Sequence, residues 1–145
     1  MAGTPVVRAL LICDHVWRDP RAGKWHVCGI FDRVGAPEAP VRQGPTGVYV
    51  NLTGLNGSYQ LAIEIVRAED ESVLGGLQQK APMLVTDPLA PYEVGFNLPG
   101  FVLPKFGKHL FRLRANGQLL QDIVFSVDRI RPHEPAADHN QGPEQ

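Results

Sequence analysis

The most regular feature of this chain is an alternation of apolar and polar side chains that returns in several short segments. In the segment Tyr59–Val66, four apolar side chains fall on one side: Tyr59, Leu61, Ile63 and Ile65. Residues two apart share a face in an extended strand, whereas a helix would spread them around its circumference. The segment is therefore predicted to be a strand with one face in a core and the other in water.

The same period of two occurs in four further segments, which are predicted as strands: Val48–Leu52, Tyr92–Leu98, Phe111–Ala115 and Ile123–Val127. Two more segments, Val6–Trp17 and Trp25–Val34, are more continuously apolar and flank the loop Asp19–Gly23. We expect them to form the first hairpin. Because continuous apolar character is typical of strands covered on both faces, we expect this pair to lie centrally in its sheet.

Turn residues connect these strands. Asn116-Gly117 predicts a two-residue type I′ hairpin, since asparagine and glycine best tolerate the two positive φ angles of that turn. Strict pairing across it would set Phe111 opposite Asp122, although the later apolar face begins at Ile123. One extra residue near Gln121-Asp122 would restore the parity, so a β-bulge is predicted there.

Two other loops predict further hairpins: Gly54–Gly57, between Val48–Leu52 and Ser58–Val66, and Glu69–Glu71, between Ser58–Val66 and Ser72–Leu74. Three prolines follow between Gly35 and Gly47: Pro37, Pro40 and Pro45. Proline cannot donate to a strand ladder, so this stretch is predicted to cross from one sheet to the other. Met83–Val85 is a possible short strand in the least regular part of the chain.

About eight short strands separated by turns predict an all-β fold, a two-layer antiparallel β-sandwich of Ig-like or C2-like type over residues 4–130. A length of 145 residues, with 43% hydrophobic and 20% charged residues, fits a single globular domain. Residues 131–145 are polar and rich in proline, and cannot bury enough apolar surface to become ordered. They are predicted to form a disordered tail.

Charge and hydropathy restrict the partners. A net charge of −1 does not favour nucleic acid or an anionic membrane as a partner. No run approaches the roughly 18 apolar residues that span a bilayer, and Arg8 interrupts the apolar N-terminal segment that could otherwise imitate a signal peptide. We expect a cytoplasmic protein in which Cys13 and Cys28 are reduced. The sequence indicates no cofactor and no particular small-molecule ligand.

Several short motifs occur along the predicted domain: Leu11–Asp14, Asp19, Gly23-Lys24, Gly29–Asp32, Tyr59-x-Leu61-x-Ile63, Phe111–Leu113 and Asn116-Gly117. With these motifs the chain resembles a family of small bacterial single-domain proteins known only as a domain of unknown function. The motifs extend over most of the predicted domain and fall largely on core and turn positions. The resemblance implies a bacterial β-sandwich and supplies no reaction, ligand or catalytic residue.

The first predicted hairpin contains a group of thiols and imidazoles. If the hairpin is centred on Pro20-Arg21, Cys13 faces Cys28 and His15 faces His26, with all four on one face. Two thiols and two imidazoles are the ligand set of a structural zinc site, and the same group could support a small catalytic domain. Against this, ligands along a flat hairpin do not converge easily on a tetrahedral centre, and the tight Cys-x-x-Cys spacing is absent.

The alternative interpretation treats both cysteines as small buried hydrophobes and both histidines as half-exposed strand residues. A thiol in the middle of an apolar strand has a raised pKa, which does not suit a nucleophile. Neither a Gly-x-Ser-x-Gly elbow nor a phosphate-binding glycine loop occurs, so we do not expect an enzyme. Five aspartates lack the short spacings of calcium loops and are predicted to be turn caps: Asp14, Asp19, Asp32, Asp70 and Asp87.

Two surfaces are candidates for protein binding. Trp17 and Trp25 flank the first loop and are expected to lie close together, capping one end of the core in the preferred interpretation or forming an exposed contact patch in the other. Arg112 and Arg114 alternate with apolar residues and should project outward, within a basic cluster that also includes Lys105, Lys108 and His109. The simpler interpretation of this cluster is a solvated sheet face.

The complete core pattern without a reactive cluster leads to one hypothesis: a non-enzymatic protein-binding or assembly module, whose partner is another protein or a second copy of the chain. A structural metal-binding or small catalytic domain is the alternative, with Cys13, His15, His26 and Cys28 at its centre.

Overall fold

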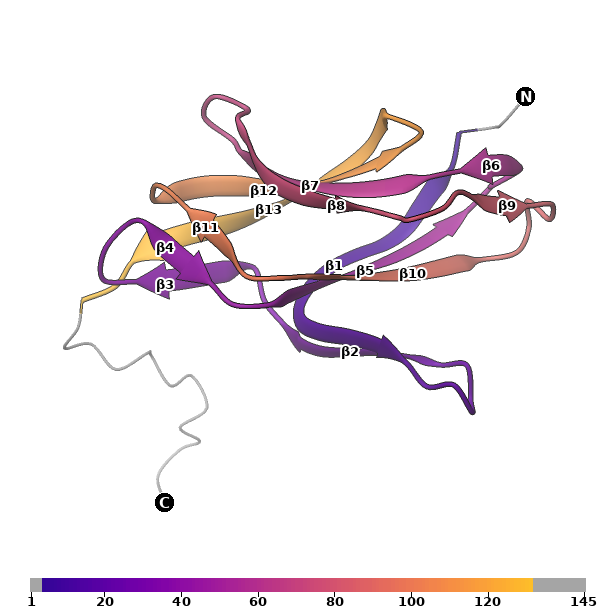
Figure 1. Cartoon of the computed structure of the whole chain (residues 1–145), viewed down its shortest axis with the longest axis horizontal. Coiled ribbons are helices and arrows are strands. Elements are labelled where there is room, and N and C mark those ends of the chain that lie inside the picture. The colour runs from indigo at the N-terminus through magenta and orange to yellow at the C-terminus, as the bar shows by residue number, and fades with distance from the viewer. Residues whose placement is uncertain (1–3, 132–145) are drawn as a thin grey trace, which may run out of the picture.

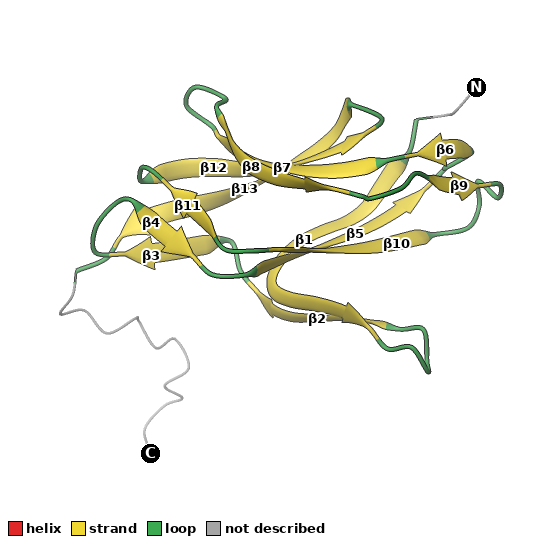
Figure 2. Cartoon of the chain, in the orientation of Figure 1, coloured by secondary structure: helices red, strands yellow, loops and turns green. Residues whose placement is uncertain are grey.

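Strands account for every regular element in residues 4–131, the part of the chain that the computed structural model describes (Figure 2). The all-β fold expected from the alternating pattern is therefore confirmed. No helix in this part of the chain is long and apolar enough to cross a membrane. Residues 132–145 of the predicted tail lie outside the described residues.

One sheet has four antiparallel strands in the order β10-β5-β1-β2. Its strands are β1 (Val6–Arg18), β2 (Trp25–Ile30), β5 (Thr46–Thr53) and β10 (Tyr92–Leu98). The predicted first hairpin is confirmed as β1 and β2. The expected central position is wrong for β2, which pairs only with β1 and forms one edge.

A second sheet has five strands in the order β3-β13-β12-β7-β8. Its strands are β3 (Arg33–Ala36), β7 (Leu61–Arg67), β8 (Val73–Gln78), β12 (Gly107–Ala115) and β13 (Gln118–Arg129). The pairing of β3 with β13 is parallel, which corrects the expectation of a purely antiparallel fold. The cause is a change of sheet within the predicted strand Trp25–Val34: its first part is β2, and after Asp32 the chain continues as β3 in the other sheet.

Two small ladders complete the described chain. β4 (Val41–Gln43) pairs with β11 (Phe101–Leu103), and β6 (Gly57–Tyr59) pairs with β9 (Met83–Val85), which confirms the short strand expected at Met83–Val85. Residues 4–131 thus contain thirteen strands where about eight were predicted. The excess consists of short strands of three or four residues, which are too brief to show a clear period of two.

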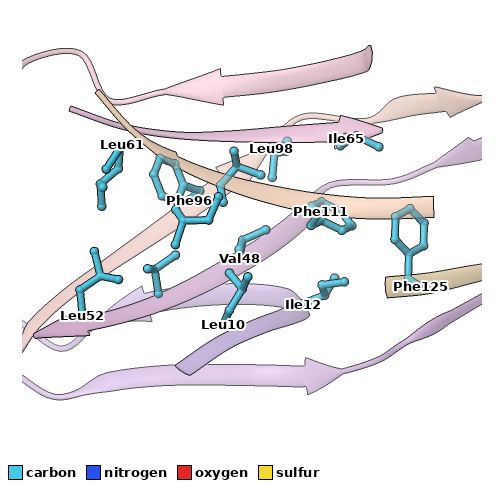
Figure 3. Close-up of a cluster of buried hydrophobic side chains, with 14 of the residues drawn as sticks. Leu10, Ile12, Val48, Leu52, Leu61, Ile65, Phe96, Leu98, Phe111 and Phe125 are labelled. Carbon is cyan, nitrogen blue, oxygen red and sulfur yellow. The ribbon is translucent and has the colours of Figure 1, made fainter. Parts of the chain in front are cut away.

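The two large sheets form two layers, with β1, β5 and β10 in one and β7, β12 and β13 in the other (Figure 1). The apolar core lies between them (Figure 3). One layer contributes Leu10, Ile12, Val48, Leu52, Phe96 and Leu98, and the other Leu61, Ile65, Phe111 and Phe125. The inward face predicted for the segment around Leu61 is confirmed, since Tyr59, Leu61, Ile63 and Ile65 are all buried.

The turn chemistry predicted between β12 and β13 is confirmed. Asn116 and Gly117 have φ angles of 51° and 80°, as the two centres of a type I′ turn require. The ladder then shifts, because Leu113 pairs with Gln121 and Arg114 with Leu119. The extra residue is Leu120, one position before the predicted bulge, and it places Phe111 opposite Ile123.

Of three loops predicted from the sequence, two connect the strands as expected and one does not. Glu69–Glu71 lies in the predicted hairpin turn, now between β7 and β8. The proline-rich stretch crosses between the sheets as predicted, from β3 to β5. Gly54–Gly57 was expected to close a hairpin, but β5 and β7 belong to different sheets, so this loop is also a crossover. A glycine loop between two amphipathic strands does not reveal whether they share a sheet.

Candidate functional site: the outer face of the first hairpin

The hairpin of β1 and β2 leaves the plane of its sheet. β1 pairs with β5 as far as Cys13 and with β2 from Cys13 to Arg18. Beyond Cys13 the hairpin lies against the outer face of β5 and β10. A Cβ added at Gly95 would be 2.5 Å from the Trp25 ring, and one added at Gly47 would be 3.1 Å from Cγ1 of Val16. These two glycines allow the hairpin to approach the sheet closely, and Figure 1 shows it below β5 and β10.

Backbone and side-chain hydrogen bonds hold the hairpin in this position. The side chain of Asn97 donates from Nδ2 to the carbonyl of Val16 at 2.9 Å and accepts from the amide of Val16 at 3.4 Å. An amide side chain on β10 thus replaces the neighbouring strand that β1 no longer has at this point. The tip is closed by the amide of Asp19, which donates to the carbonyl of Lys24 at 2.8 Å.

The two faces of the hairpin differ in burial. Trp25 and Val27 are half-buried on the face toward the sheet, and Val16 between them is buried. The opposite face carries four side chains, which we call the hairpin face: His15, Trp17, His26 and Cys28. Trp17 is 42% exposed on this face, and Ile30 at the end of β2 is 63% exposed. The hairpin therefore presents both an aromatic and an aliphatic side chain to solvent.

A ring stack lies at the centre of the hairpin face. Trp17 and His26 are cross-strand partners, and their rings stack with centroids 4.2 Å apart and planes 9° from parallel. Cross-strand pairs of this kind stabilise a sheet by about 0.2–1 kcal/mol. The stack also holds the Trp17 ring in one orientation while leaving its outer side open to solvent.

The register of this hairpin corrects the expected arrangement of thiols and imidazoles. Cys13 is opposite Ile30 and His15 is opposite Cys28, instead of Cys13 opposite Cys28. The turn closed by Asp19 and Lys24 is centred on Arg21-Ala22, one residue later than predicted. Moving the centre of a turn by one residue moves every cross-strand partner by two.

The predicted zinc ligands therefore separate. Cys13 is fully buried, and burial raises the pKa of its thiol, in the direction expected from the sequence. His15, His26 and Cys28 lie on the hairpin face, and both cysteines are free thiols. Within residues 4–131, no three His, Cys, Asp or Glu side chains are grouped so as to hold a metal ion. The structure thus gives the metal-binding alternative no support.

The two tryptophans lie on opposite faces of the hairpin. Trp17 is exposed on the hairpin face, whereas Trp25 packs over Gly95 with its ring centroid 6.3 Å from that of Tyr49. Neither belongs to the core between the sheets. The preferred expectation that they cap the core together is wrong, because each strand residue points to the side opposite its neighbour and Trp17 pairs with His26, not with Trp25.

The predicted basic surface is occupied by ion pairs. Arg112 and Arg114 project away from the core on β12, as expected. Arg112 Nε donates to Asp122 at 2.9 Å, and Arg114 pairs with Glu64. His109, which was grouped with them, is fully buried. This surface therefore matches a solvated sheet face with internally paired charges.

Other predicted sites also have structural roles. Asp19 accepts from the amide of Arg21 at 2.9 Å, Asp70 from that of Ser72 at 3.1 Å, and Asp87 from that of Leu89 at 3.0 Å. These three turn caps were predicted from the sequence. Ile30 was missed as a contact residue, although it is an apolar side chain that is 63% exposed at the end of β2.

Comparison with known proteins identifies a family of unknown function and weak structural similarities. A family model described as "Family of unknown function (DUF6941)" matches residues 8–128. No curated protein matches the chain. Among solved structures, the Pseudomonas fluorescens alkylpurine DNA glycosylase AlkC bound to DNA containing an abasic site analog is similar at 12% identity and a TM-score of 0.36. That match covers 81% of this chain and only 30% of the other, which is too little to support a functional conclusion.

Proposed function

The chain belongs to DUF6941, a family of unknown function, and from this premise we propose that it is a non-enzymatic module that binds another protein through its hairpin face. One observation carries the proposal: the exposed Trp17 ring is stacked on His26, in the same hairpin that also exposes Ile30. The surface is formed by a strand ladder, so its geometry is defined before a partner binds.

The energetics favour a protein contact at this surface. Tryptophan is enriched among the residues that contribute most to protein interfaces, because it buries a large apolar area and fixes only two torsions. Burying an aliphatic side chain such as that of Ile30 stabilises a contact by about 1.5–3 kcal/mol. The stack on His26 restricts the Trp17 ring in advance, which reduces an ordering cost of about 0.5–1.5 kcal/mol per side chain.

The proposal extends to the location of the protein. The thiol of Cys28 is exposed and unpaired on the hairpin face. An accessible free thiol is maintained in a reducing compartment, so we place the protein in the bacterial cytoplasm, as the sequence led us to expect.

The experiment is affinity capture from the native host with three forms of the full chain. The double variant Trp17→Ala/His26→Ala removes the stack and should lose specific partners by at least about tenfold, the loss that corresponds to about 1.4 kcal/mol. Leu84→Ala is the matched control, because Leu84 is a 74% exposed apolar residue on β9, which pairs with β6 and not with the hairpin. It should capture the same partners as the unchanged chain.

The capture result is informative only if every form of the chain is folded. Circular dichroism should show that all three forms are folded, since the stacked residues lie outside the core. A folded double variant that captures the same proteins in the same amounts as the unchanged chain would contradict a binding role for the hairpin face.

A further inference from the structure

The free edge of β2 points to a second partner-binding feature of the hairpin. β2 pairs with β1 on one side, and no strand of the described chain pairs with its other side. The backbone amides and carbonyls along such an edge can form a ladder with another extended chain. This edge borders the hairpin face, so an added strand would extend that surface.

The side chains of β2 include none of the charges that usually protect an edge. The strand Trp25–Ile30 contains no proline, lysine, arginine or carboxylate, and its irregular position is Gly29, whose φ is 72°. The other edge strands of the two large sheets differ: β3 contains Arg33, β10 contains Glu93, and β8 contains the flexible pair Gly75-Gly76 together with a register shift. Natural sheets use charges and irregularities of this kind to prevent edge pairing. The uncharged strands β6, β9 and β11 of the small ladders are only three residues long, so β2 is the longest described edge without a charge.

The distribution of charge along the hairpin indicates which partner is complementary to its edge. Its tip carries three exposed cations, Arg18, Arg21 and Lys24, and its base carries two exposed carboxylates, Asp14 and Asp32. Asp19 adds one carboxylate to the tip, Glu93 of β10 lies beside Arg18, and Arg33 at the base pairs with Asp128 at 3.4 Å, so the cations remain in excess at the tip and the carboxylates at the base. The hairpin is therefore positive at one end and negative at the other.

A hairpin with opposite charges at its ends is complementary to an antiparallel copy of itself. When two such hairpins lie antiparallel, the tip of each faces the base of the other, whereas a parallel arrangement would bring like charges together. We propose that a second copy of this chain pairs its β2 antiparallel with the free edge of β2, so that the two hairpin faces form one surface. This rests on the proposed function, whose binding surface it extends and for which it names the partner.

The symmetry of this pairing makes the interface isologous and places Cys28 near its centre. A two-fold axis perpendicular to the ladder pairs residues that share a face, and an axis at Cys28 places the two Cys28 side chains opposite each other on the same face. Cys13 is fully buried and does not compete as a reactive thiol. Cross-linking of Cys28 can therefore test whether two β2 strands pair in this way.

The first measurement combines sedimentation equilibrium with thiol cross-linking of the intact, reduced chain. The mass should rise with concentration from 15.9 kDa toward twice that value. A short bis-maleimide, which alkylates one thiol at each end, should then produce a covalent dimer. Cys28→Ala should remain dimeric in sedimentation and lose the cross-link. A monomer at all concentrations, or a cross-link that survives Cys28→Ala, would overturn the inference.

The second measurement tests the charge pattern by exchange. Arg21→Glu/Lys24→Glu makes the tip negative, and Asp14→Lys/Asp32→Lys makes the base positive. Each variant alone should self-associate at least about tenfold more weakly, since like charges then face each other. An equimolar mixture of the two should restore the dimer, because each new charge meets its opposite in the other chain. Restoration also shows that both variants are folded; a mixture no better than either variant alone would overturn the antiparallel arrangement.

The failure of this inference is distinguishable from the failure of the proposed function. A chain that stays monomeric but captures a different protein in a Trp17-dependent way would retain the binding function and exclude the second copy as the partner. A dimer whose formation is indifferent to Trp17→Ala/His26→Ala would retain the edge pairing and remove the role of the hairpin face.

Discussion

At the residue scale, the most unusual side chain is that of His109, because it is an ionisable imidazole in the apolar core. It is fully buried on β12, its ring centroid 5.3 Å from that of Phe125 and its Nδ1 3.0 Å from the carbonyl of Gly107. Its Nε2 is buried and has no hydrogen-bond partner among the described residues. Burial lowers the pKa of His109 below its ordinary value of 6.5, and the nearby Arg67 lowers it further. The folded protein therefore holds this imidazole neutral.

This burial predicts that the free energy of unfolding falls in mild acid. Below pH 6.5 the unfolded chain binds a proton at His109 that the folded chain excludes, so stability decreases as the pH falls through the range below that value. Above pH 6.5 the imidazole of His109 is neutral in both the folded and the unfolded chain, so it no longer makes stability depend on pH. Urea unfolding between about pH 8 and about pH 5 should show this loss, and His109→Leu should reduce it.

The carboxyl of Asp70 does not contribute to the loss of stability in this pH range. Asp70 lies on the neighbouring β7–β8 loop, and its hydrogen bond from Arg67 holds the pKa of that carboxyl below 3.8, so its contribution to stability is lost only in stronger acid. Identical pH dependence in the unchanged chain and in His109→Leu would show that the buried imidazole is not responsible.

At the scale of the element, close contact with two glycines positions the hairpin. Trp25 occupies the space where a side chain at position 95 would lie, since a Cβ there would be 2.5 Å from the ring. The side chain of Val16, on β1, also lies near this position, at 3.1 Å from the same Cβ. The orientation of the hairpin face thus depends on glycine in β10, a strand distant in sequence.

We therefore expect Gly95→Ala to displace the hairpin and to destabilise the protein by about 1–3 kcal/mol, the usual cost of overpacking a close contact. Hydrogen exchange should accelerate in β2 more than in β7 or β12. Gly44→Ala is the matched control, because no atom lies within 4 Å of its Cβ position and its φ is not in the positive region. It should be neutral or stabilise by up to about 1 kcal/mol. Equal effects of the two substitutions would argue against the packing of Trp25 on Gly95.

At the scale of the whole molecule, the two sheets share one core. Phe111 on β12 lies 4.9 Å from Phe125 and 6.3 Å from Phe101, between ring centroids, and belongs to the same buried cluster as Val48 and Leu52 of the opposite sheet. Neither sheet can bury its apolar face without the other. The chain should therefore unfold as one cooperative unit.

Phe111→Ala should lower the free energy of unfolding by about 3–5 kcal/mol, because it opens a cavity between the sheets. Both tryptophans lie in the hairpin, so tryptophan fluorescence reports on that element while far-UV circular dichroism reports on all strands. The two denaturation curves should coincide for Phe111→Ala, whereas Leu89→Ala should change stability by less than about 0.5 kcal/mol. Separate transitions would show that the hairpin or one sheet unfolds on its own.

Local patterns in the sequence were sufficient for the strands and for several turns. The inward face of Leu61, Ile63 and Ile65 follows from a period of two, which the geometry of an extended chain imposes wherever one face is buried. The turn at Asn116-Gly117 follows from its tolerance of positive φ, and the bulge beside it follows from the parity of the apolar residues. His109 could have been placed in the core by the same rule, since it is two residues before Phe111.

The partners of each strand were decided by the tertiary structure. Nothing near Gly54–Gly57 reveals that β5 and β7 belong to different sheets, because each would show the same alternation in a hairpin. The register of the first hairpin depends on which residues close its turn. Because the turn is centred one residue later than predicted, Cys13 pairs with Ile30 instead of Cys28. The exposure of Trp17 depended on Gly95 and Asn97, some eighty residues away in sequence. A side-chain period is a property of a few neighbouring residues, whereas the choice of partner depends on contacts that exist only after the chain has folded.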